Sequence, residues 1–290
     1  MITIENDFIK ASFLTKGAEW RSLVEKNQGQ EFLWQADPAY WAKSSPVLFP
    51  FVGSLKDGAY EYQGQSYSMG RHGFARDQEF RVKEQEPWRV VFVLESGDAS
   101  RAVYPFDWSL EIEYRVWKRV VQIAYRVINR GTVDLLFSLG AHPAFQMPIV
   151  PGGRFEDGTL DFEAAEPLER WMLDAKGLLS GERRLVPTEG QSLALSRDLF
   201  SEDAVIFKGL KSNRVRLRQQ GSAWGLNLEF SGFPYLGIWS APKAPFVCIE
   251  PWCGITDSTV STGRLEDKEG IERLAAGQIF QRSFSVTVER

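Results

Sequence analysis

The two histidines of this chain are the residues best suited to proton transfer, and each lies in an unusual local motif. His72 lies in GRHGFARD and His142 in LGAHPAF. Histidine can gain or lose a proton near neutral pH with an unperturbed pKa. A third motif, CIEPWCG, places Glu250 after an apolar run. Two imidazoles and one buried carboxylate are the components of a general acid–base site, so the sequence predicts proton-transfer chemistry.

Glu250 follows the apolar residues 246–249 and precedes Pro251 and Trp252. We expect its carboxylate to emerge at a strand end among apolar groups. Desolvation would raise its pKa above the usual value of about 4.3 and make it a better base. The alternative is a structural glutamate that accepts hydrogen bonds from turn amides or pairs with an arginine. The Pro-Trp sequence favours the functional interpretation.

His142 is preceded by Gly140 and Ala141 and followed by Pro143. Proline disfavours the helical region for the residue before it, so His142 is expected to be extended. The two small residues would leave room for a ligand beside the imidazole ring. The alternative is a buried histidine that hydrogen-bonds a backbone carbonyl.

The segment around His72 has two interpretations. If it is extended, it is either a ligand-binding segment or a surface strand in which Arg76 and Asp77 form an ordinary ion pair. Gly70 and Gly73 indicate that another group closely approaches the backbone there. The glycines favour a functional role for His72.

The composition is that of an ordinary globular protein, and it excludes several classes of function. The chain has 290 residues, 43% of them hydrophobic and 25% charged, with a net charge of −4. We expect one domain spanning 1–290. The slight acidity argues against nucleic-acid binding, and the basic residues of 214–218 alternate with apolar ones as on the solvated face of a strand. No apolar run approaches the ~18–20 residues of a membrane span, and no signal peptide is evident, so we expect no membrane partner and a cytoplasmic location.

The sequence gives little reason to expect a metal or an organic cofactor. No glycine-rich nucleotide-binding motif is present, and no Gly-x-Ser-x-Gly motif marks a serine nucleophile. Metal sites need clustered ligands, whereas His72 and His142 are far apart and lack a histidine companion at i+2 or i+4. Cys248 and Cys253 flank Glu250, and a disulfide between them is possible, but two cysteines do not make a disulfide framework.

Period-2 alternation predicts strands along most of the chain. The segments 110–117 and 119–128 alternate apolar and polar residues and are joined closely enough to form a hairpin. Further strands are expected at 89–94, 133–139, 213–218, 225–230, 236–240, 246–249 and 282–289. One short helix is expected at 266–276 and one helical turn at 198–200. The sequence therefore predicts an all-β protein, one large antiparallel β-sandwich. Most of its aromatic residues, 13% of the chain, are expected in the core, and some could serve a carbohydrate site, which composition alone does not distinguish.

These motifs, taken together and in order, resemble the aldose 1-epimerase (mutarotase) family, and most of all its LacX-type branch. The resemblance rests on SPVLFPFVGSLKDG at 45–58, RHGFARD around His72, GAHPAF around His142 and CIEPW around Glu250. It implies a galactose mutarotase-like antiparallel β-supersandwich. It also implies a small sugar as the substrate and a mechanism without metal or cofactor.

The resemblance assigns a role to each candidate residue. Glu250 would be the base that takes the proton from the C1 hydroxyl of the sugar, and His142 the acid that protonates the ring oxygen. His72 would hydrogen-bond the sugar near these atoms, and Asp203 would hold sugar hydroxyls. The alternative for Asp203 is a helix or turn cap.

One position departs from the family pattern. Well-studied mutarotases use an arginine where this chain has Ser54, and Arg71 is a candidate replacement in substrate binding. Related hexose-6-phosphate epimerases share the His-Gly-Phe-Ala-Arg pattern and bind phosphate through arginines. The preferred hypothesis is epimerisation of a free aldose. Epimerisation of a hexose 6-phosphate and sugar binding or sensing without turnover are the alternatives, and a monomer and a homodimer are both compatible with the sequence.

Overall fold

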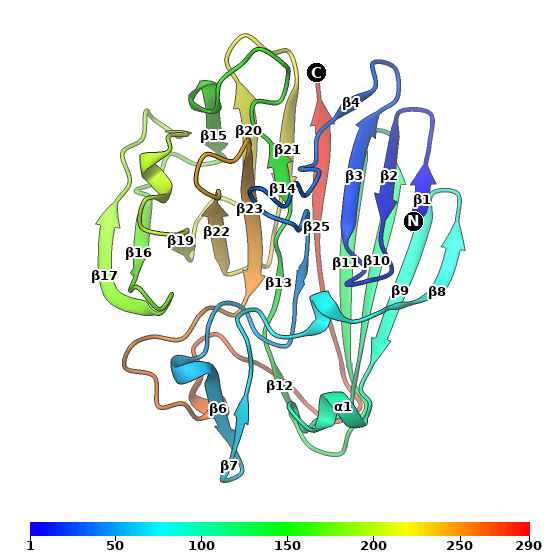
Figure 1. Ribbon diagram of the computed structural model, residues 1–290, viewed down its shortest axis with the longest axis vertical. Coiled ribbons are helices and arrows are strands. Elements are labelled where there is room, and N and C mark those ends of the chain that lie inside the picture. Colours follow the sequence, from blue (N-terminus) through cyan, green and yellow to red (C-terminus); the bar gives the residue numbers. More distant parts are fainter.

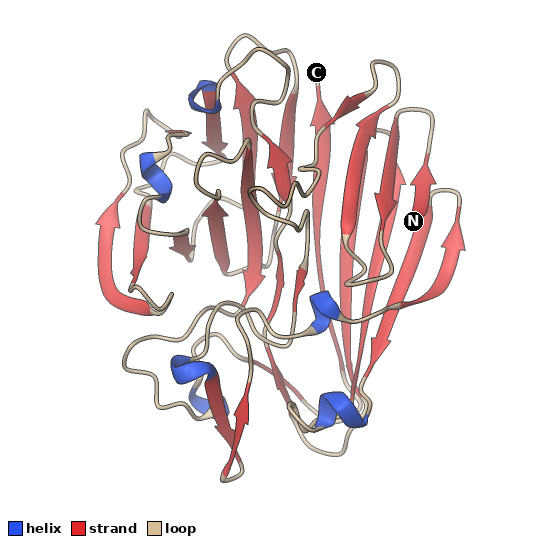
Figure 2. Cartoon of the chain, viewed as in Figure 1, coloured by secondary structure: helices blue, strands red, loops and turns tan.

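Strands make up almost all the regular structure of this chain, as expected where polar and apolar residues alternate. The computed structural model describes residues 1–290, and Figure 2 shows how few helical turns interrupt the strands. The one α-helix, α1, spans Asp98–Arg101, and no helix is long and apolar enough to cross a membrane.

The elements are numbered in chain order. The strands are β1 (Ile2–Glu5), β2 (Ile9–Phe13), β3 (Trp20–Glu25), β4 (Gln30–Glu31), β5 (Val47–Leu48), β6 (Ala59–Tyr62), β7 (Gln65–Ser68), β8 (Arg81–Glu86), β9 (Arg89–Glu95), β10 (Trp108–Trp117), β11 (Val120–Asn129), β12 (Leu135–Phe137), β13 (Leu139–Ala141), β14 (Ala144–Gln146), β15 (Gly158–Phe162), β16 (Glu169–Leu173), β17 (Leu179–Leu185), β18 (Ser192–Ala194), β19 (Val205–Lys208), β20 (Arg214–Gln219), β21 (Gly225–Glu229), β22 (Tyr235–Trp239), β23 (Phe246–Cys253), β24 (Glu272–Leu274) and β25 (Ile279–Glu289). The 3-10 turns are η1 (Lys56–Gly58), η2 (Ala75–Asp77), η3 (Phe155–Asp157), η4 (Asp198–Phe200) and η5 (Leu265–Asp267).

Two large antiparallel sheets form the body of the molecule. One has nine strands in the order β18-β15-β20-β21-β25-β11-β10-β9-β8, and the other has eight in the order β17-β16-β19-β22-β23-β13-β5, with β14 also paired to β23. In Figure 1, β8 to β11 lie on the right, and β16, β17, β19, β22 and β23 lie on the left. The four N-terminal strands β1 to β4 form a smaller sheet.

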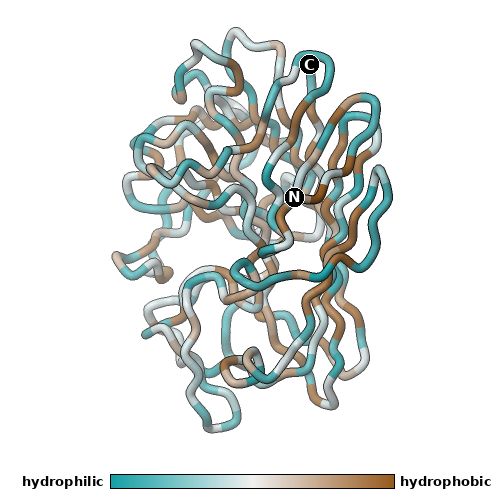
Figure 3. The backbone as a smooth tube through the Cα atoms, turned by 45° about the vertical axis from the view of Figure 1, so that its right-hand side comes forward, coloured by the Kyte–Doolittle hydropathy of each residue, from teal (hydrophilic) through white to brown (hydrophobic).

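The two large sheets share one apolar core. Phe162 of β15 meets Phe207 of β19 edge to face, with ring centroids 5.8 Å apart, and so joins the nine-stranded sheet to the eight-stranded one. A cluster of 64 buried residues draws side chains from both sheets. Hydrophobic and hydrophilic residues alternate along the strands in Figure 3, as a half-buried sheet requires. The predicted antiparallel β-sandwich is thus confirmed.

Three of the local predictions are confirmed in detail. The hairpin expected around Lys118 is β10–β11, with pairs running from Trp108↔Asn129 to Trp117↔Val120. The basic stretch at 214–218 lies in β20, where the arginines are exposed and the apolar residues between them are buried. The expected turn at 198–200 is η4.

The helix predicted at 266–276 is wrong. This segment contains only η5 and, beyond it, strand β24, which pairs with β12. Gly270 lies between them with a φ of +70°, a left-handed conformation that ends a helix instead of continuing it.

Two further strand predictions need correction, and the cysteine pairing left open by the sequence has an answer. The single strand expected at 133–139 is split at Ser138, because β12 pairs with β24 whereas β13 pairs with β23 and β5. The strand expected to end at residue 249 continues to Cys253, so Glu250 lies inside β23 and not at its end. Cys248 and Cys253 are both free thiols, not a disulfide. Their separation of five residues, an odd number, places the two side chains on opposite faces of the same strand.

Candidate active site

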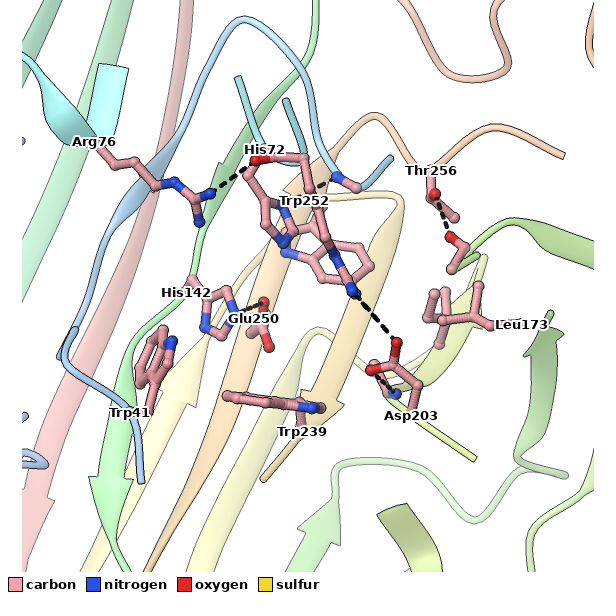
Figure 4. A pocket seen from close by; sticks show the side chains of 15 residues that line it. Trp41, His72, Arg76, His142, Leu173, Asp203, Trp239, Glu250, Trp252 and Thr256 are labelled. Atoms are coloured by element: carbon pink, nitrogen blue, oxygen red, sulfur yellow. Dashed lines mark hydrogen bonds and ion pairs between the residues drawn. The ribbon is translucent and has the colours of Figure 1, made fainter. Parts of the chain in front are cut away.

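The five residues singled out from the sequence line one cavity of about 290 Å³: Arg71, His72, His142, Asp203 and Glu250. They come from four separate segments of the chain, which the pairing around β23 brings together. Figure 4 shows the side chains of His72, His142, Asp203 and Glu250 around the cavity, with Trp41 and Trp239 on one side of it.

Strand β23 carries the central carboxylate of the cavity. Glu250 pairs in register with Gly237 of β22, and its side chain is 1% exposed. Side chains alternate along a strand, so Cys248, Glu250 and Trp252 share one face. The register of β23 with β22 therefore fixes where the Glu250 side chain enters the cavity.

Two glycines make room for the indole of Trp252. A Cβ at Gly140 would lie 2.7 Å from Trp252 Cδ1, and one at Gly237 would lie 2.4 Å from Trp252 Cη2. The expectation that the small residues before His142 leave space for a ligand is therefore wrong at Gly140, where the space is filled by Trp252. Close packing of this indole explains the glycine.

His142 lies against Glu250 at the floor of the cavity. Its Nε2 is 3.4 Å from Glu250 Oε2. The imidazole stacks on Trp41, with ring centroids 4.8 Å apart and planes at 30°, and its neighbour Trp239 meets it edge-on at 5.7 Å. These aromatic contacts hold the ring against the carboxyl group, as Figure 4 shows.

The pair lacks the partners that a purely structural role would require. Glu250 Oε2 and His142 Nδ1 are buried and make no hydrogen bond. Leaving a buried polar atom unpaired costs about 1–3 kcal/mol. The turn amides considered from the sequence as partners of Glu250 do not reach its Oε2. Unsatisfied atoms at the edge of a cavity are suited to contact with the polar groups of a ligand.

Burial moves the pKa values of the two groups in opposite directions. Desolvation raises the pKa of Glu250 well above its ordinary value, and the positive charge of Arg71 partly opposes this rise. Desolvation lowers the pKa of His142 to about 3, and the charges of Arg71 and Arg76 act in the same direction. Both shifts favour the neutral form of each group, a protonated carboxyl group and an unprotonated imidazole.

His72 has a fixed protonation pattern. Its Nδ1 accepts a hydrogen bond of 3.0 Å from the Gly53 N–H, and the backbone N–H of His72 donates to the Gly53 carbonyl at 2.8 Å. Burial lowers the pKa of His72 well below its ordinary value, and His142 and the nearby arginines add to this effect. A neutral imidazole that accepts at Nδ1 carries its proton on Nε2. His72 is therefore a hydrogen-bond donor at Nε2.

The backbone at His72 is not extended, so the surface strand considered as the alternative for this segment is not formed. His72 and Gly73 have φ values of +69° and +70°, and η2 follows directly. A Cβ at Gly73 would lie 2.3 Å from the Phe49 carbonyl oxygen, so the close approach expected at this glycine is confirmed. Nothing lies within 4 Å of a Cβ placed at Gly70, where the same expectation is wrong.

Arg71 and Asp203 form an ion pair at the rim of the cavity. Both terminal nitrogens of Arg71 lie 3.4 Å from Asp203 Oδ2. Asp203 Oδ1 accepts a hydrogen bond from the Ala204 N–H at 2.8 Å. This bond joins adjacent residues and does not cap a helix or a turn, so the ion pair with Arg71 is the interaction that places Asp203 at the cavity.

Ser54, the departure from the family pattern, does not line the cavity. Its backbone N–H donates to Thr256 Oγ1 at 3.0 Å. Arg71 supplies a guanidinium group to the cavity from the following loop, and its carbonyl accepts a hydrogen bond of 2.8 Å from Arg76 Nη2. Arg76 also lies 3.8 Å from Asp77, the ion pair considered from the sequence.

Several cavity residues were not identified from the sequence. Trp41 and Trp239 border His142 directly, and Thr256 and Arg76 line other parts of the wall. In a chain with ten tryptophans, no local spacing separates those of a site from those of the core. The donor atoms of His142, Cys248 and Glu250 lie within 4.8 Å of one another. These three residues are therefore the candidate ligands for a metal ion.

Known proteins resemble this chain over nearly its full length. The family model described as aldose 1-epimerase matches residues 1–268. The chromosomal protein LacX of Lactococcus lactis subsp. lactis is 34% identical, over 99% of each chain. The structure of a galactose mutarotase related enzyme from Lactobacillus acidophilus is 37% identical with a TM-score of 0.95, covering 100% of this chain and 97% of that one. A galactose mutarotase-like protein from Lactobacillus casei gives 32% identity and a TM-score of 0.94, covering 100% of both chains.

Proposed function

This chain belongs to the aldose 1-epimerase family, and on that premise we propose that it is an isomerase that interconverts the α and β anomers of a free aldose. The observation that carries the proposal is the buried pair formed by His142 and Glu250, 3.4 Å apart beside a cavity. An acid and a base are both required, because one sugar oxygen loses a proton while another gains one.

Glu250 acts as the base and His142 as the acid. Glu250 takes the proton of the C1 hydroxyl as His142 donates a proton to the ring oxygen. The bond between C1 and the ring oxygen breaks, and a carbonyl group forms at C1. Rotation about the C1–C2 bond presents the other face of this carbonyl. The two proton transfers then run in reverse and close the ring as the opposite anomer.

The cycle requires one proton transfer within the pair before a cyclic sugar can react. The pKa directions place the single proton of the pair on Glu250. This is the state that follows ring opening, when the carboxyl group has gained a proton and the imidazole has lost one. Before a cyclic sugar can react, the proton must return from Glu250 to His142, and their contact at 3.4 Å gives it a short route.

The remaining cavity residues bind and orient the sugar. His72 donates from Nε2 to a sugar oxygen, because its Nδ1 is already occupied by Gly53. Arg71 and Asp203 offer donors and acceptors to hydroxyl groups at the rim. The indole groups of Trp41 and Trp239 provide apolar surface for the C–H faces of the ring.

Epimerisation of a hexose 6-phosphate is a second candidate, favoured by one observation. Arg71 and Arg76 both line the cavity, and two guanidinium groups can bind a phosphate. Competition between glucose and glucose 6-phosphate distinguishes the two substrates. If the phosphate is preferred, Arg76→Gln should reduce that preference, whereas Arg130→Gln, at an exposed arginine, should leave it unchanged.

Polarimetry of freshly dissolved α-glucose and α-galactose tests the proposal. We expect the rate constant of mutarotation to rise in proportion to protein concentration and above the buffer rate. Calorimetric titration with the same sugars measures binding independently of turnover. Sugar binding without any acceleration of anomer exchange, for free and phosphorylated sugars alike, would contradict the proposal and indicate a binding or sensing protein.

A further inference from the structure

A buried thiol lies beside the proposed acid–base pair. Cys248 and Glu250 share one face of β23, because they are two residues apart on a strand. His142 lies between β13 and β14, and both of these short strands pair with β23. The fold thereby gathers one nitrogen, one sulfur and one oxygen donor whose atoms lie within 4.8 Å of one another.

The three donors are suited to a metal ion by their chemistry and by their lack of partners. A thiolate, an imidazole and a carboxylate are the three ligand types that zinc uses in proteins. The thiolate and the carboxylate together would balance the charge of a divalent cation. Glu250 Oε2 is buried without a hydrogen-bond partner, His142 Nε2 faces it at 3.4 Å, and both residues line the cavity through which an ion could enter.

We propose that His142, Cys248 and Glu250 form an inhibitory site for a thiophilic divalent cation such as Zn²⁺. The thiol and the carboxyl group each release a proton to solvent when the ion binds. The ion then occupies the lone pairs of Glu250 and His142 that proton transfer requires. The inhibitory role rests on the proposed epimerase function, whereas binding of the ion does not.

The choice of donors determines which ions should bind. Sulfur and imidazole ligands favour Zn²⁺ and Cd²⁺, whereas Mg²⁺ prefers oxygen ligands and retains its waters. Ions with a high affinity for sulfur should therefore inhibit the enzyme, and Mg²⁺ should have no effect. A sugar bound in the cavity and the cation should compete, since both use Glu250 and His142.

Titration of the chelator-treated protein with ZnCl₂ and CdCl₂ tests the site without reference to turnover. Calorimetry should give one tight equivalent of either ion, and CdCl₂ should produce a thiolate-to-metal absorption band. Cys248→Ala should abolish the band. It should also weaken metal binding by at least roughly 10- to 100-fold, because even the loss of a residue that only supports a metal ligand has that effect. Cys253→Ala, which removes the other buried thiol, is the matched control and should keep both signals.

Two further measurements keep the proposal open to contradiction. Cys248→Ser preserves the size of the side chain and Glu250→Gln removes a different ligand, so both should weaken binding if Cys248→Ala does not fold. An absorption band that persists without Cys248, or no tight equivalent in the wild-type protein, would overturn the site. Tight binding with undiminished anomer exchange would overturn the inhibitory role alone. If the protein accelerates no anomer exchange at all, calorimetry and the absorption band still decide the metal site.

Discussion

His142 Nε2 lies 3.4 Å from Glu250 Oε2, and both side chains are buried at the floor of one cavity. Groups this close titrate as a pair, and their apparent pKa values belong to the pair. Desolvation favours the neutral form of each group, so the carboxyl group is the protonated member and the imidazole the neutral one. Proton exchange between the two is therefore part of the proposed cycle.

The activity of the free enzyme should have an unusual pH dependence. The active pair holds one proton; a second proton binds near the His142 pKa of about 3, and the single proton is lost above the raised pKa of Glu250. We expect kcat/KM, measured with chelator present, to remain high well below pH 6 and to fall only as the pH approaches about 3. An acidic limb near the ordinary imidazole pKa of about 6.5 would contradict this assignment.

Arg71 should influence the alkaline limb of the same profile. Its charge lowers the pKa of Glu250, so Arg71→Gln should raise that pKa and shift the alkaline limb to higher pH. Arg71→Lys retains the charge and should shift the limb less. Identical limbs in the two variants would mean that Arg71 acts on the substrate alone.

His72 should contribute to sugar binding and to folding through different atoms. His72→Phe removes the Nε2 donor, and we expect KM to rise by about fivefold, the effect of one hydrogen bond of about 1 kcal/mol. The same change leaves the buried Gly53 N–H without its side-chain acceptor and should lower the free energy of unfolding by about 1–3 kcal/mol. Steady-state kinetics and urea denaturation measure the two effects. A loss confined to kcat would instead identify His72 as a proton-transfer group.

The close packing of Trp252 against Gly237 should tolerate no added methyl group. A Cβ at Gly237 would lie 2.4 Å from the indole ring, so Gly237→Ala should lower the free energy of unfolding by about 1–3 kcal/mol through overpacking. It should also reduce anomer exchange, because Trp252 borders the cavity. Gly70→Ala is the control, since its Cβ would meet open space. Equal stability of the two variants, measured by urea denaturation, would show that Trp252 moves aside freely.

The buried ion pair of Lys268 and Asp257 should stabilise the loop that carries Thr256. Lys268 Nζ lies 2.7 Å from Asp257 Oδ1 and also donates to the Ile255 carbonyl at 2.8 Å. Removing one partner of a buried pair costs about 3–5 kcal/mol, so Lys268→Met should lower the free energy of unfolding by that amount. Lys211→Met, at an exposed lysine, should change it little. Urea denaturation of both variants provides the comparison.

The architecture and the central motifs could be predicted from the sequence because they depend on local patterns. Alternation in 110–117 and 119–128 specified a hairpin, and the His142 and Glu250 motifs each contained unusual neighbours. The left-handed backbone at His72 could not be predicted, because it depends on packing against Gly53 and Phe49, which lie far away in the sequence.

Tertiary pairing explains the other differences. The 266–276 segment has a helix-like composition, but the pairing of β24 with β12 decides its structure. The cysteine and glutamate of the candidate metal site are two residues apart and could be seen to share a strand face. Their histidine partner could not, because only the pairing of β13 and β14 with β23 brings His142 beside them. For the same reason Trp41 could not be distinguished from a core tryptophan.

The most direct test of the account is anomer exchange measured by polarimetry for His142→Asn, Glu250→Gln and the double variant, with Glu86→Gln at an exposed glutamate as the control. General acid–base groups contribute roughly 10²- to 10⁴-fold, and groups that act as a unit are not additive. We predict that each single variant loses activity by about that factor, that the double variant is no slower than the slower single one, and that the control retains full activity. Wild-type rates in Glu250→Gln, or losses that multiply in the double variant, would contradict a shared proton between His142 and Glu250.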